Sequence, residues 1–182
     1  MSDARLRLRS LVETAMMVAA AVALSYVKVW EMPQGGSVTL GSMVPILLVG
    51  LRHGPGWGVT AGVLDGLLQF WLDPYFYHPV QVVLDYPVAF GLLGLAGLAR
   101  GHARWVAAWL GSLAIAGRFA AHVISGVVFF AQFAPEGQSP LIYSIIYNGS
   151  YLLPEAVLSA VLLMVLLPAL ERALPVRVGS VH

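Results

Sequence analysis

The sequence predicts an all-α integral membrane protein, a compact bundle of six transmembrane helices. The chain of 182 residues is 59% hydrophobic and only 10% charged. Its apolar residues also collect in long runs separated by short loops, and a helix that crosses a bilayer needs about 20 mainly apolar residues. We therefore expect residues 1–182 to form a single transmembrane domain. The predicted helices lie at about residues 8–29, 40–51, 56–72, 80–99, 105–133 and 140–170.

The first run, 8–29, has no clear cleavage pattern after it, so we interpret it as a retained helix rather than a secretory signal. Ala15, Ala19 and Ala23 recur at every fourth position and therefore share one helix face. A stripe of small side chains lets another helix approach closely. The stripe is consistent with packing inside the bundle and equally with the docking of a separate membrane subunit.

The second and third runs, 40–51 and 56–72, are short for transmembrane helices, and the sequence leaves open whether the second crosses fully. The segment Met-Pro-Gln-Gly-Gly-Ser at 32–37 precedes them. Proline and paired glycines predict a turn with a mobile backbone. This turn suits a lid over a pocket and equally an ordinary hairpin.

The last three runs contain ionisable residues, which are costly inside a membrane and usually functional. Asp85 lies near the outer end of the run 80–99. Arg118 and His122 lie one turn apart in the run 105–133, so they share a face. We expect Arg118 to be the counter-ion of a buried carboxylate, namely Asp85, Asp65 or Glu155.

Basic residues predict the orientation, because Lys and Arg near the ends of spans are retained on the cytoplasmic side. The loops near 31–39, 73–79 and 134–139 contain neither residue type. Both termini are therefore expected in the cytoplasm of a prokaryotic cell, with the protein in its plasma membrane among the lipids. The basic residues on the predicted inner side are Arg5, Arg7, Arg9, Arg52, Arg100, Arg104, Arg172 and Arg177.

Several function classes are disfavoured by composition and by missing motifs. The absence of cysteine excludes disulfides, thiolate metal sites and cysteine nucleophiles, and no other metal-ligand cluster is evident. A net charge of +1 gives no indication of nucleic-acid binding. No phosphate-binding loop is present, so energy for transport would have to come from an ion gradient or from another polypeptide.

Polar and aromatic side chains gather at the outer ends of the last three predicted helices. One carboxylate, one imidazole, one carboxamide and several rings suit a flat, partly cationic small molecule that forms hydrogen bonds. Any single tyrosine among them could instead belong to the aromatic belt of the membrane interface. The set is Asp85, Tyr86, His122, Phe129, Phe130, Tyr143, Tyr147 and Asn148.

Four segments resemble the ThiT (YuaJ-like) family, the thiamine-specific S components of energy-coupling factor (ECF) transporters. The resemblance implies high-affinity capture of thiamine by a six-helix bundle. It also implies association with a transmembrane coupling subunit and two cytoplasmic ATPase subunits, which use the ATP, and it implies no cofactor and no enzymatic activity. The segments are MPQGGSV at 32–38, HPVQVVLDYPVAFGLLGLAG at 78–97, RFAAHVISGVVFF at 118–130 and YSIIYNGSYLLPE at 143–155.

The resemblance also implies a set of thiamine-binding residues. The family's pyrimidine-binding carboxylate falls on Asp85, and some members have Glu there and Trp in place of Phe130. A lid-loop Trp of some relatives aligns near Gly36, and Trp30 is a candidate substitute. The docking face falls on Ala15, Ala19 and Ala23. The complete set of predicted binding residues is Asp85, Tyr86, His122, Gly126, Phe130, Tyr143, Asn148, Tyr75 and Arg118.

Two other classes of function remain open at this point. A membrane-embedded enzyme could use Asp85 and His122 as an acid and base pair. A stand-alone or proton-coupled carrier could use Asp85, Asp65 or Glu155 as its proton site. Within the same transporter class, a thiamine precursor or another vitamin is the alternative ligand.

Overall fold

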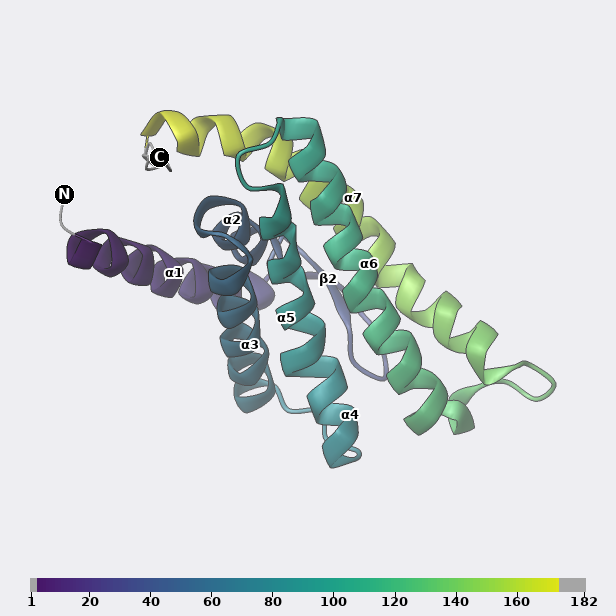
Figure 1. The fold of residues 1–182 in the computed structure, drawn as a ribbon. Helices are drawn as coiled ribbons and strands as arrows, with labels where there is room; N and C mark the ends of the chain where they lie inside the picture. Colours follow the sequence, from purple (N-terminus) through teal and green to yellow (C-terminus); the bar gives the residue numbers. More distant parts are fainter. Residues whose placement is uncertain (1–2, 174–182) are drawn as a thin grey trace.

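The computed structural model describes residues 3–173 and has helices at all six predicted runs (Figure 1). Arg177, which was predicted to lie on the inner side, is outside the described residues. The fourth run is one continuous helical rod made of four segments, α4, η1, α5 and η2. The elements are α1 (Asp3–Ser25), β1 (Lys28–Glu31), β2 (Ser37–Thr39), α2 (Val44–His53), α3 (Pro55–Leu72), α4 (Pro79–Val83), η1 (Leu84–Val88), α5 (Ala89–Leu93), η2 (Gly94–Ala99), α6 (Arg104–Phe129), η3 (Ala131–Phe133) and α7 (Pro140–Ala173).

Four helices within residues 3–173 are long and apolar enough to cross a bilayer, which confirms the all-helical membrane fold. They are Ala4–Ser25, Pro79–Ala99, Arg104–Phe129 and Pro140–Leu170. The ten residues of α2 rise only about 15 Å, about half the thickness of the hydrocarbon layer. This helix ends at Gly54, whose φ of +98° breaks the helix, and Pro55 then begins α3. The second predicted run is therefore a short helix and does not have the length of a full span.

A row of glycines on α3 brings this helix into backbone contact with the rod 79–99. Gly58, Gly62 and Gly66 are spaced by four, so they share one face. A Cβ on Gly58 would lie 2.8 Å from the Cα of Gly94, and one on Gly66 would lie 2.5 Å from the carbonyl oxygen of Tyr86. The two backbones can approach this closely only because side chains are missing there. This contact fixes the position of the segment that carries Asp85.

The rod 79–99 changes its helical pitch next to Asp85. Residues Leu84–Val88 form a short π-helical segment that contains Pro87. Proline removes an intrahelical donor, and single π-turns in α-helices occur frequently at functional sites. The irregular turn thus coincides with the carboxylate that the sequence singled out.

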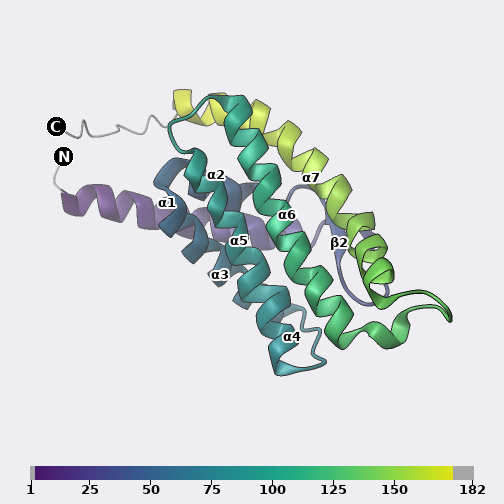
Figure 2. The same cartoon turned by 45° about the vertical axis from the view of Figure 1, so that its right-hand side comes forward.

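Two short strands enclose the predicted turn at 32–37. β1 pairs with β2 in antiparallel register, with Trp30 opposite Val38 and Glu31 opposite Ser37. Gly35 and Gly36 have φ values of +83° and +88°, a conformation that other residues rarely adopt. The root of the hairpin is held by α7, because the backbone N–H and the hydroxyl of Thr39 both donate to the Glu155 carboxylate. Figure 2 shows this hairpin beside α6 and α7, which pack side by side.

Helix α1 extends away from the rest of the bundle in both ribbon views (Figures 1 and 2). Thr14, Val18 and Ala21 are buried against the neighbouring helices, whereas the Ala15, Ala19 and Ala23 stripe is exposed. The stripe therefore does not pack against the other described helices of the bundle. The alternative, a face open to another helix, stays a prediction.

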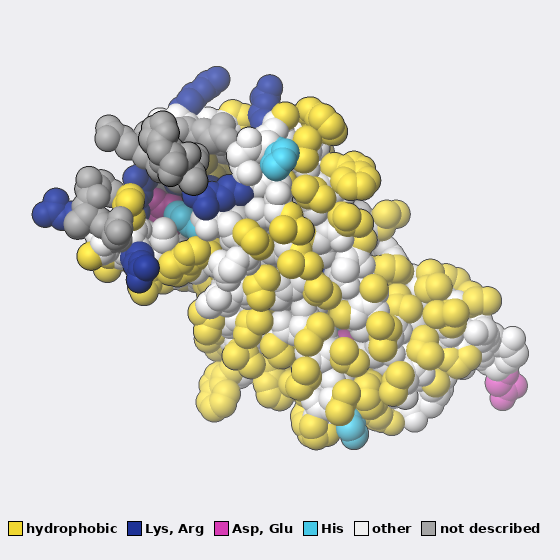
Figure 3. All heavy atoms as spheres, in the orientation of Figure 1, with side chains coloured by type: hydrophobic (Ala, Val, Ile, Leu, Met, Phe, Trp, Pro, Cys, Tyr) yellow, Lys and Arg dark blue, Asp and Glu magenta, His cyan; other side chains and the backbone are white. Residues whose placement is uncertain are grey.

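Ionic contacts at the middle of α1 fix this helix to the end of α2. The Glu13 carboxylate accepts from Arg9 at 2.8 Å, from Arg52 at 3.1 Å and lies 2.9 Å from a ring nitrogen of His53. Lys and Arg side chains gather at this end of the molecule, and apolar side chains cover the flanks below it (Figure 3). The distribution agrees with a membrane protein whose basic residues lie on one side.

Candidate functional site

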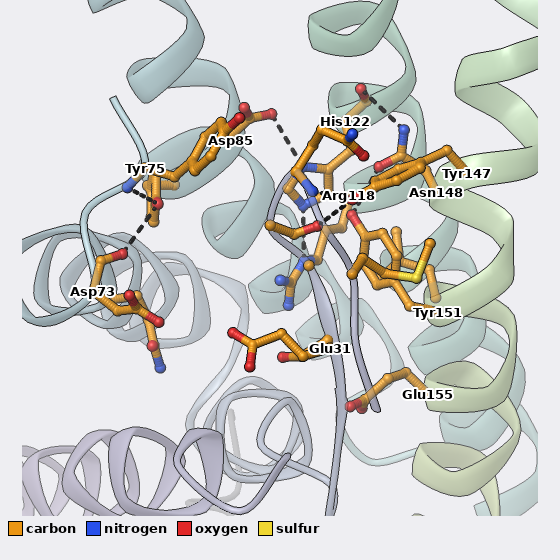
Figure 4. A pocket seen from close by; sticks show the side chains of 18 of the residues that line it. Glu31, Asp73, Tyr75, Asp85, Arg118, His122, Tyr147, Asn148, Tyr151 and Glu155 are labelled. Carbon is orange, nitrogen blue, oxygen red and sulfur yellow. Dashed lines mark hydrogen bonds and ion pairs between the residues drawn. The ribbon is translucent and has the colours of Figure 1, made fainter. Parts of the chain in front are cut away.

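A cavity of about 650 Å³ opens between the hairpin, α3, the loop 73–79, η1, α6 and α7. Its walls come from segments far apart in the sequence (Figure 4). All nine residues predicted to bind the ligand line this cavity, although their role in binding stays a prediction. They are Tyr75, Asp85, Tyr86, Arg118, His122, Gly126, Phe130, Tyr143 and Asn148.

Three neutral donors hold the carboxylate of Asp85. Oδ1 lies 3.0 Å from His122 Nδ1, and Oδ2 accepts from Gln81 Nε2 at 2.8 Å and from Ser125 Oγ at 2.9 Å. Its side chain is 16% exposed, so it is largely shielded yet still lines the cavity. A carboxylate in this setting keeps spare acceptor capacity on Oδ1 and has no directly bound cation. It is therefore prepared for a cationic or hydrogen-donating ligand.

The tautomer of His122 follows from its two partners. Arg118 Nε lies 3.2 Å from His122 Nε2, and because a guanidinium can only donate, Nε2 must be the acceptor. The proton of a neutral ring is then on Nδ1, where it is donated to Asp85 Oδ1. A continuous chain of hydrogen bonds thus runs from Arg118 through His122 to Asp85.

Within residues 3–173, Arg118 forms no ion pair with a buried carboxylate, so the expectation that it is such a counter-ion is wrong. Its guanidinium carbon lies 4.0 Å from the ring centre of Phe90 and its Nε reaches His122, but no ion pair joins it to Asp85, Asp65 or Glu155. One helical turn of separation places Arg118 against the imidazole first. The hydrogen-bonded connection of Arg118 to Asp85 therefore runs through His122.

Asn148 is a buried support of the site, and both ends of its amide form hydrogen bonds with protein groups. Its Nδ2 donates to the Ser144 carbonyl at 2.9 Å, and its Oδ1 accepts from the Tyr151 hydroxyl at 2.7 Å. The same Nδ2 lies 3.5 Å from the His122 carbonyl oxygen. Asn148 thereby fixes the distance between α6 and α7 at the level of His122.

Gly126 permits this close contact between α6 and α7. A Cβ at this position would lie 3.0 Å from the Ser144 Cβ and closer still to its hydroxyl. We expect Gly126→Ala to destabilise the protein by about 1–3 kcal/mol, because the extra methyl group overpacks the interface. Thermal unfolding in detergent would measure this loss.

Gly149→Ala is the matched control for that experiment. A Cβ at Gly149 meets only a ring carbon of Phe119 at 3.9 Å, an ordinary contact, and alanine is preferred over glycine within a helix by about 1 kcal/mol. The control variant should melt at or above the wild-type temperature. Equal melting temperatures for the two variants would contradict the packing role of Gly126.

Aromatic rings form the outer wall of the cavity. The Phe130 ring lies 5.9 Å from Tyr75 and 5.4 Å from Tyr77, centre to centre. Tyr143 and Tyr147 pair at 5.8 Å on the opposite wall. Aromatic faces attract cations, by up to about 2 kcal/mol when both are desolvated.

Tyr86 connects this wall to the neighbouring loop. Its hydroxyl accepts from the Tyr75 backbone N–H at 3.0 Å and donates to the Asp73 carbonyl at 3.4 Å. The ring also packs edge-on against Phe70 at 5.2 Å. Tyr86 therefore fixes the loop that presents Tyr75 to the cavity.

The hairpin covers one side of the cavity and is held by contacts of Tyr147 and Lys28 in addition to the Thr39–Glu155 contact. The Tyr147 hydroxyl accepts from Gln34 N–H at 2.8 Å and donates to the Gly35 carbonyl at 2.9 Å. Lys28 Nζ lies 2.7 Å from Glu31 and 3.0 Å from Asp73. The hydrogen bond to Glu31, with the nearby Asp73 charge, raises the pKa of Lys28 above its usual value.

Trp30 does not take the place of the lid tryptophan that some relatives have. Trp30 is 65% exposed on β1 and does not line the cavity. Gly36 does line the cavity, and a Cβ there would collide with the Tyr151 ring. The ring of Tyr151 occupies the space beside the hairpin turn.

Several residues of the site were not predicted from the sequence. Gln81 and Ser125 bind Asp85, and Tyr151 binds Asn148. Glu155, named above only as a possible partner of Arg118 or proton site, anchors β2. A polar residue one turn before Asp85 was a usable signal for Gln81, since residues four apart share a helix face. Tyr151, three residues after Asn148, had the same kind of signal, whereas Ser125 had none because its partner Asp85 lies on another helix. Among the described residues, no group of His, Asp and Glu side chains could hold a metal ion.

Comparisons with known proteins show the family to which this chain is related. The profile of the family described as "Thiamine transporter protein (Thia_YuaJ)" matches residues 11–174. The chain is 41% identical to the thiamine transporter ThiT of Bacillus subtilis over an alignment 182 positions long, which covers 90% of this chain and 93% of that protein.

Two further relatives support the same assignment. ThiT of Lacticaseibacillus paracasei is 34% identical over an alignment 173 positions long, which covers 86% of each chain. A solved structure of ThiT from Listeria monocytogenes superposes with a TM-score of 0.79 at 26% identity, covering 91% of this chain and 97% of that chain. The family profile covers most of the chain and the identities are high, so this protein belongs to the thiamine transporter (ThiT, YuaJ-like) family.

Proposed function

We propose that this protein captures thiamine with high affinity from the outer face of the plasma membrane, as the substrate-binding S component of an ECF-type importer. The observation that carries the proposal is the Asp85 carboxylate, held by three neutral donors inside a cavity with aromatic walls. Thiamine combines a permanently cationic thiazolium ring with a donating aminopyrimidine. The cavity offers a complementary group for each part.

The contacts suggest a division of roles among the lining residues. Asp85 accepts from the aminopyrimidine or attracts the ring cation through the free capacity of Oδ1. Phe130, Tyr75 and Tyr143 surround the thiazolium ring. Asn148 is assigned a supporting role, because both ends of its amide are already bonded to Ser144 and Tyr151. Discrimination against other molecules then follows from leaving a buried polar group unpaired, which costs about 1–3 kcal/mol.

Transport requires partners in this proposal. The chain has no phosphate-binding loop, and the exposed stripe Ala15, Ala19 and Ala23 suits a transmembrane coupling subunit that joins the protein to two cytoplasmic ATPase subunits. The basic residues near the ends of the spans support cytoplasmic termini. The named relatives are transporters, which favours binding without chemistry over an enzymatic use of Asp85 and His122.

Isothermal titration calorimetry of the purified protein in detergent tests the ligand. Thiamine should bind saturably at one site, whereas riboflavin and biotin should give no binding heat. Calorimetry is preferred to tryptophan quenching because no Trp in the described residues lines the cavity. Absence of thiamine binding in folded protein would overturn the proposal, and thiamine uptake into vesicles without ATPase subunits would favour a stand-alone carrier instead.

A further inference from the structure

We propose that Gln81 is the positioning residue of the site, a buried clamp that sets both the Asp85 carboxylate and the aromatic wall. Its side chain is 1% exposed and lies one helical turn before Asp85. The inference rests on the proposed binding of a cationic, thiamine-like ligand at Asp85.

The amide of Gln81 uses all of its hydrogen-bonding capacity. Nε2 donates to Asp85 Oδ2 at 2.8 Å and to the Tyr75 carbonyl at 3.2 Å. Oε1 accepts from the backbone N–H groups of Tyr77 at 3.1 Å and His78 at 3.5 Å. Two donors and two acceptors are thus satisfied at once, and a flipped amide would lose every one of these bonds.

These bonds determine which oxygen of Asp85 is offered to the ligand. Gln81 and Ser125 together occupy Oδ2, whereas Oδ1 receives only the His122 ring. The carboxylate is therefore held without free rotation, and Oδ1 keeps an acceptor position. Because the amide is neutral, the clamp fixes the carboxylate without cancelling its negative charge.

The same side chain holds the loop that forms the aromatic wall. Tyr75 and Tyr77, whose backbones bind the Gln81 amide, carry the two rings that pack against Phe130. A ligand cation would be placed between this wall and Asp85. Gln81 thus fixes the Asp85 carboxylate and the aromatic wall relative to each other, and this role requires no direct contact with the ligand.

Two variants test the clamp against a purely structural role. Gln81→Met keeps the size of the side chain and removes all four hydrogen bonds, so thiamine affinity should fall by about 10- to 100-fold. Gln81→Glu places a second carboxylate beside Asp85 and should weaken binding at pH 8. At pH 6 a proton shared by the two carboxylates restores the donor to Asp85. The thiamine affinity of this variant should therefore rise by about 10-fold from pH 8 to pH 6, after division by the change that wild type shows over the same range.

The wild-type protein measured at each pH accounts for the other charged or titratable groups near the site. These are His122, Arg118, His78, Lys28, Glu31, Asp73, Glu155 and Asp65. Gln138→Glu is the matched control, because it makes the same substitution in the loop before α7, outside the cavity lining. Its affinity should follow the wild-type profile at both pH values.

The outcomes separate this inference from the proposed function. If wild-type protein binds thiamine but Gln81→Met binds it within about twofold, or Gln81→Glu shows the wild-type pH profile, the clamp is wrong and the proposed function stands. If wild type binds no thiamine, the proposed function itself fails. Should Gln81→Met not fold, the pH profile of Gln81→Glu alone decides the inference.

Discussion

Asp85→Asn is expected to weaken thiamine binding by about 100-fold or more. The substitution keeps the size of the side chain but removes the negative charge, and breaking one side of a buried charge pair typically costs about 3–5 kcal/mol. It also turns one oxygen into a donor, which would face either the donating amide of Gln81 or the donating ring of His122. The affinity is measured by calorimetric titration, with thermal unfolding as the test that the variant is folded.

Glu136→Gln is the matched control for the charge change. Glu136 is exposed in the loop before α7 and does not line the cavity. The control should bind thiamine as wild type does. A folded Asp85→Asn protein with unchanged affinity would remove Asp85 from the binding site. It would also leave the proposed function without its main observation.

Ala19→Trp is expected to abolish thiamine uptake in cells while thiamine binding by the purified protein stays within about twofold of wild type. Ala19 is exposed at the centre of the stripe that includes Ala15 and Ala23. A tryptophan side chain there would hold a docking helix away from the α1 backbone, and close approach is what small residues provide. Binding should survive because the cavity is lined by other elements and only by the last residue of α1.

Leu113→Trp is the matched control on another helix. Leu113 is 53% exposed on α6, a face where a large apolar side chain is already present. Uptake by this variant should equal that of wild type, which separates a blocked docking face from a general effect of an added tryptophan on membrane insertion. Normal uptake with Ala19→Trp would refute the docking role of the stripe.

Much of the fold and part of the site could be predicted from the sequence because the relevant signals are local. The six apolar runs correspond to the helices, and the separation of Arg118 and His122 by one turn correctly placed them on one face. The nine predicted binding residues line one cavity, and the resemblance to the family supplied their roles as hypotheses. Hydropathy and helical period act over a few residues, so they can be recognised before any tertiary contact is known.

The tertiary structure decided the partners and the orientation of each face. Helix spacing alone left Arg118 free to pair with three carboxylates, and in the described part of the chain it forms an ion pair with none of them. The packing of α6 against η1 places the ring of His122 against Asp85. The stripe on α1 was equally compatible with inner packing, until the rotation of the helix placed it outside. His122 and Ser125 meet Asp85 across sequence separations of 37 and 40 residues. Such contacts depend on how whole helices pack against one another. The glycine row on α3, which brings α3 close to the segment that carries Asp85, likewise acts through tertiary contact rather than through local sequence.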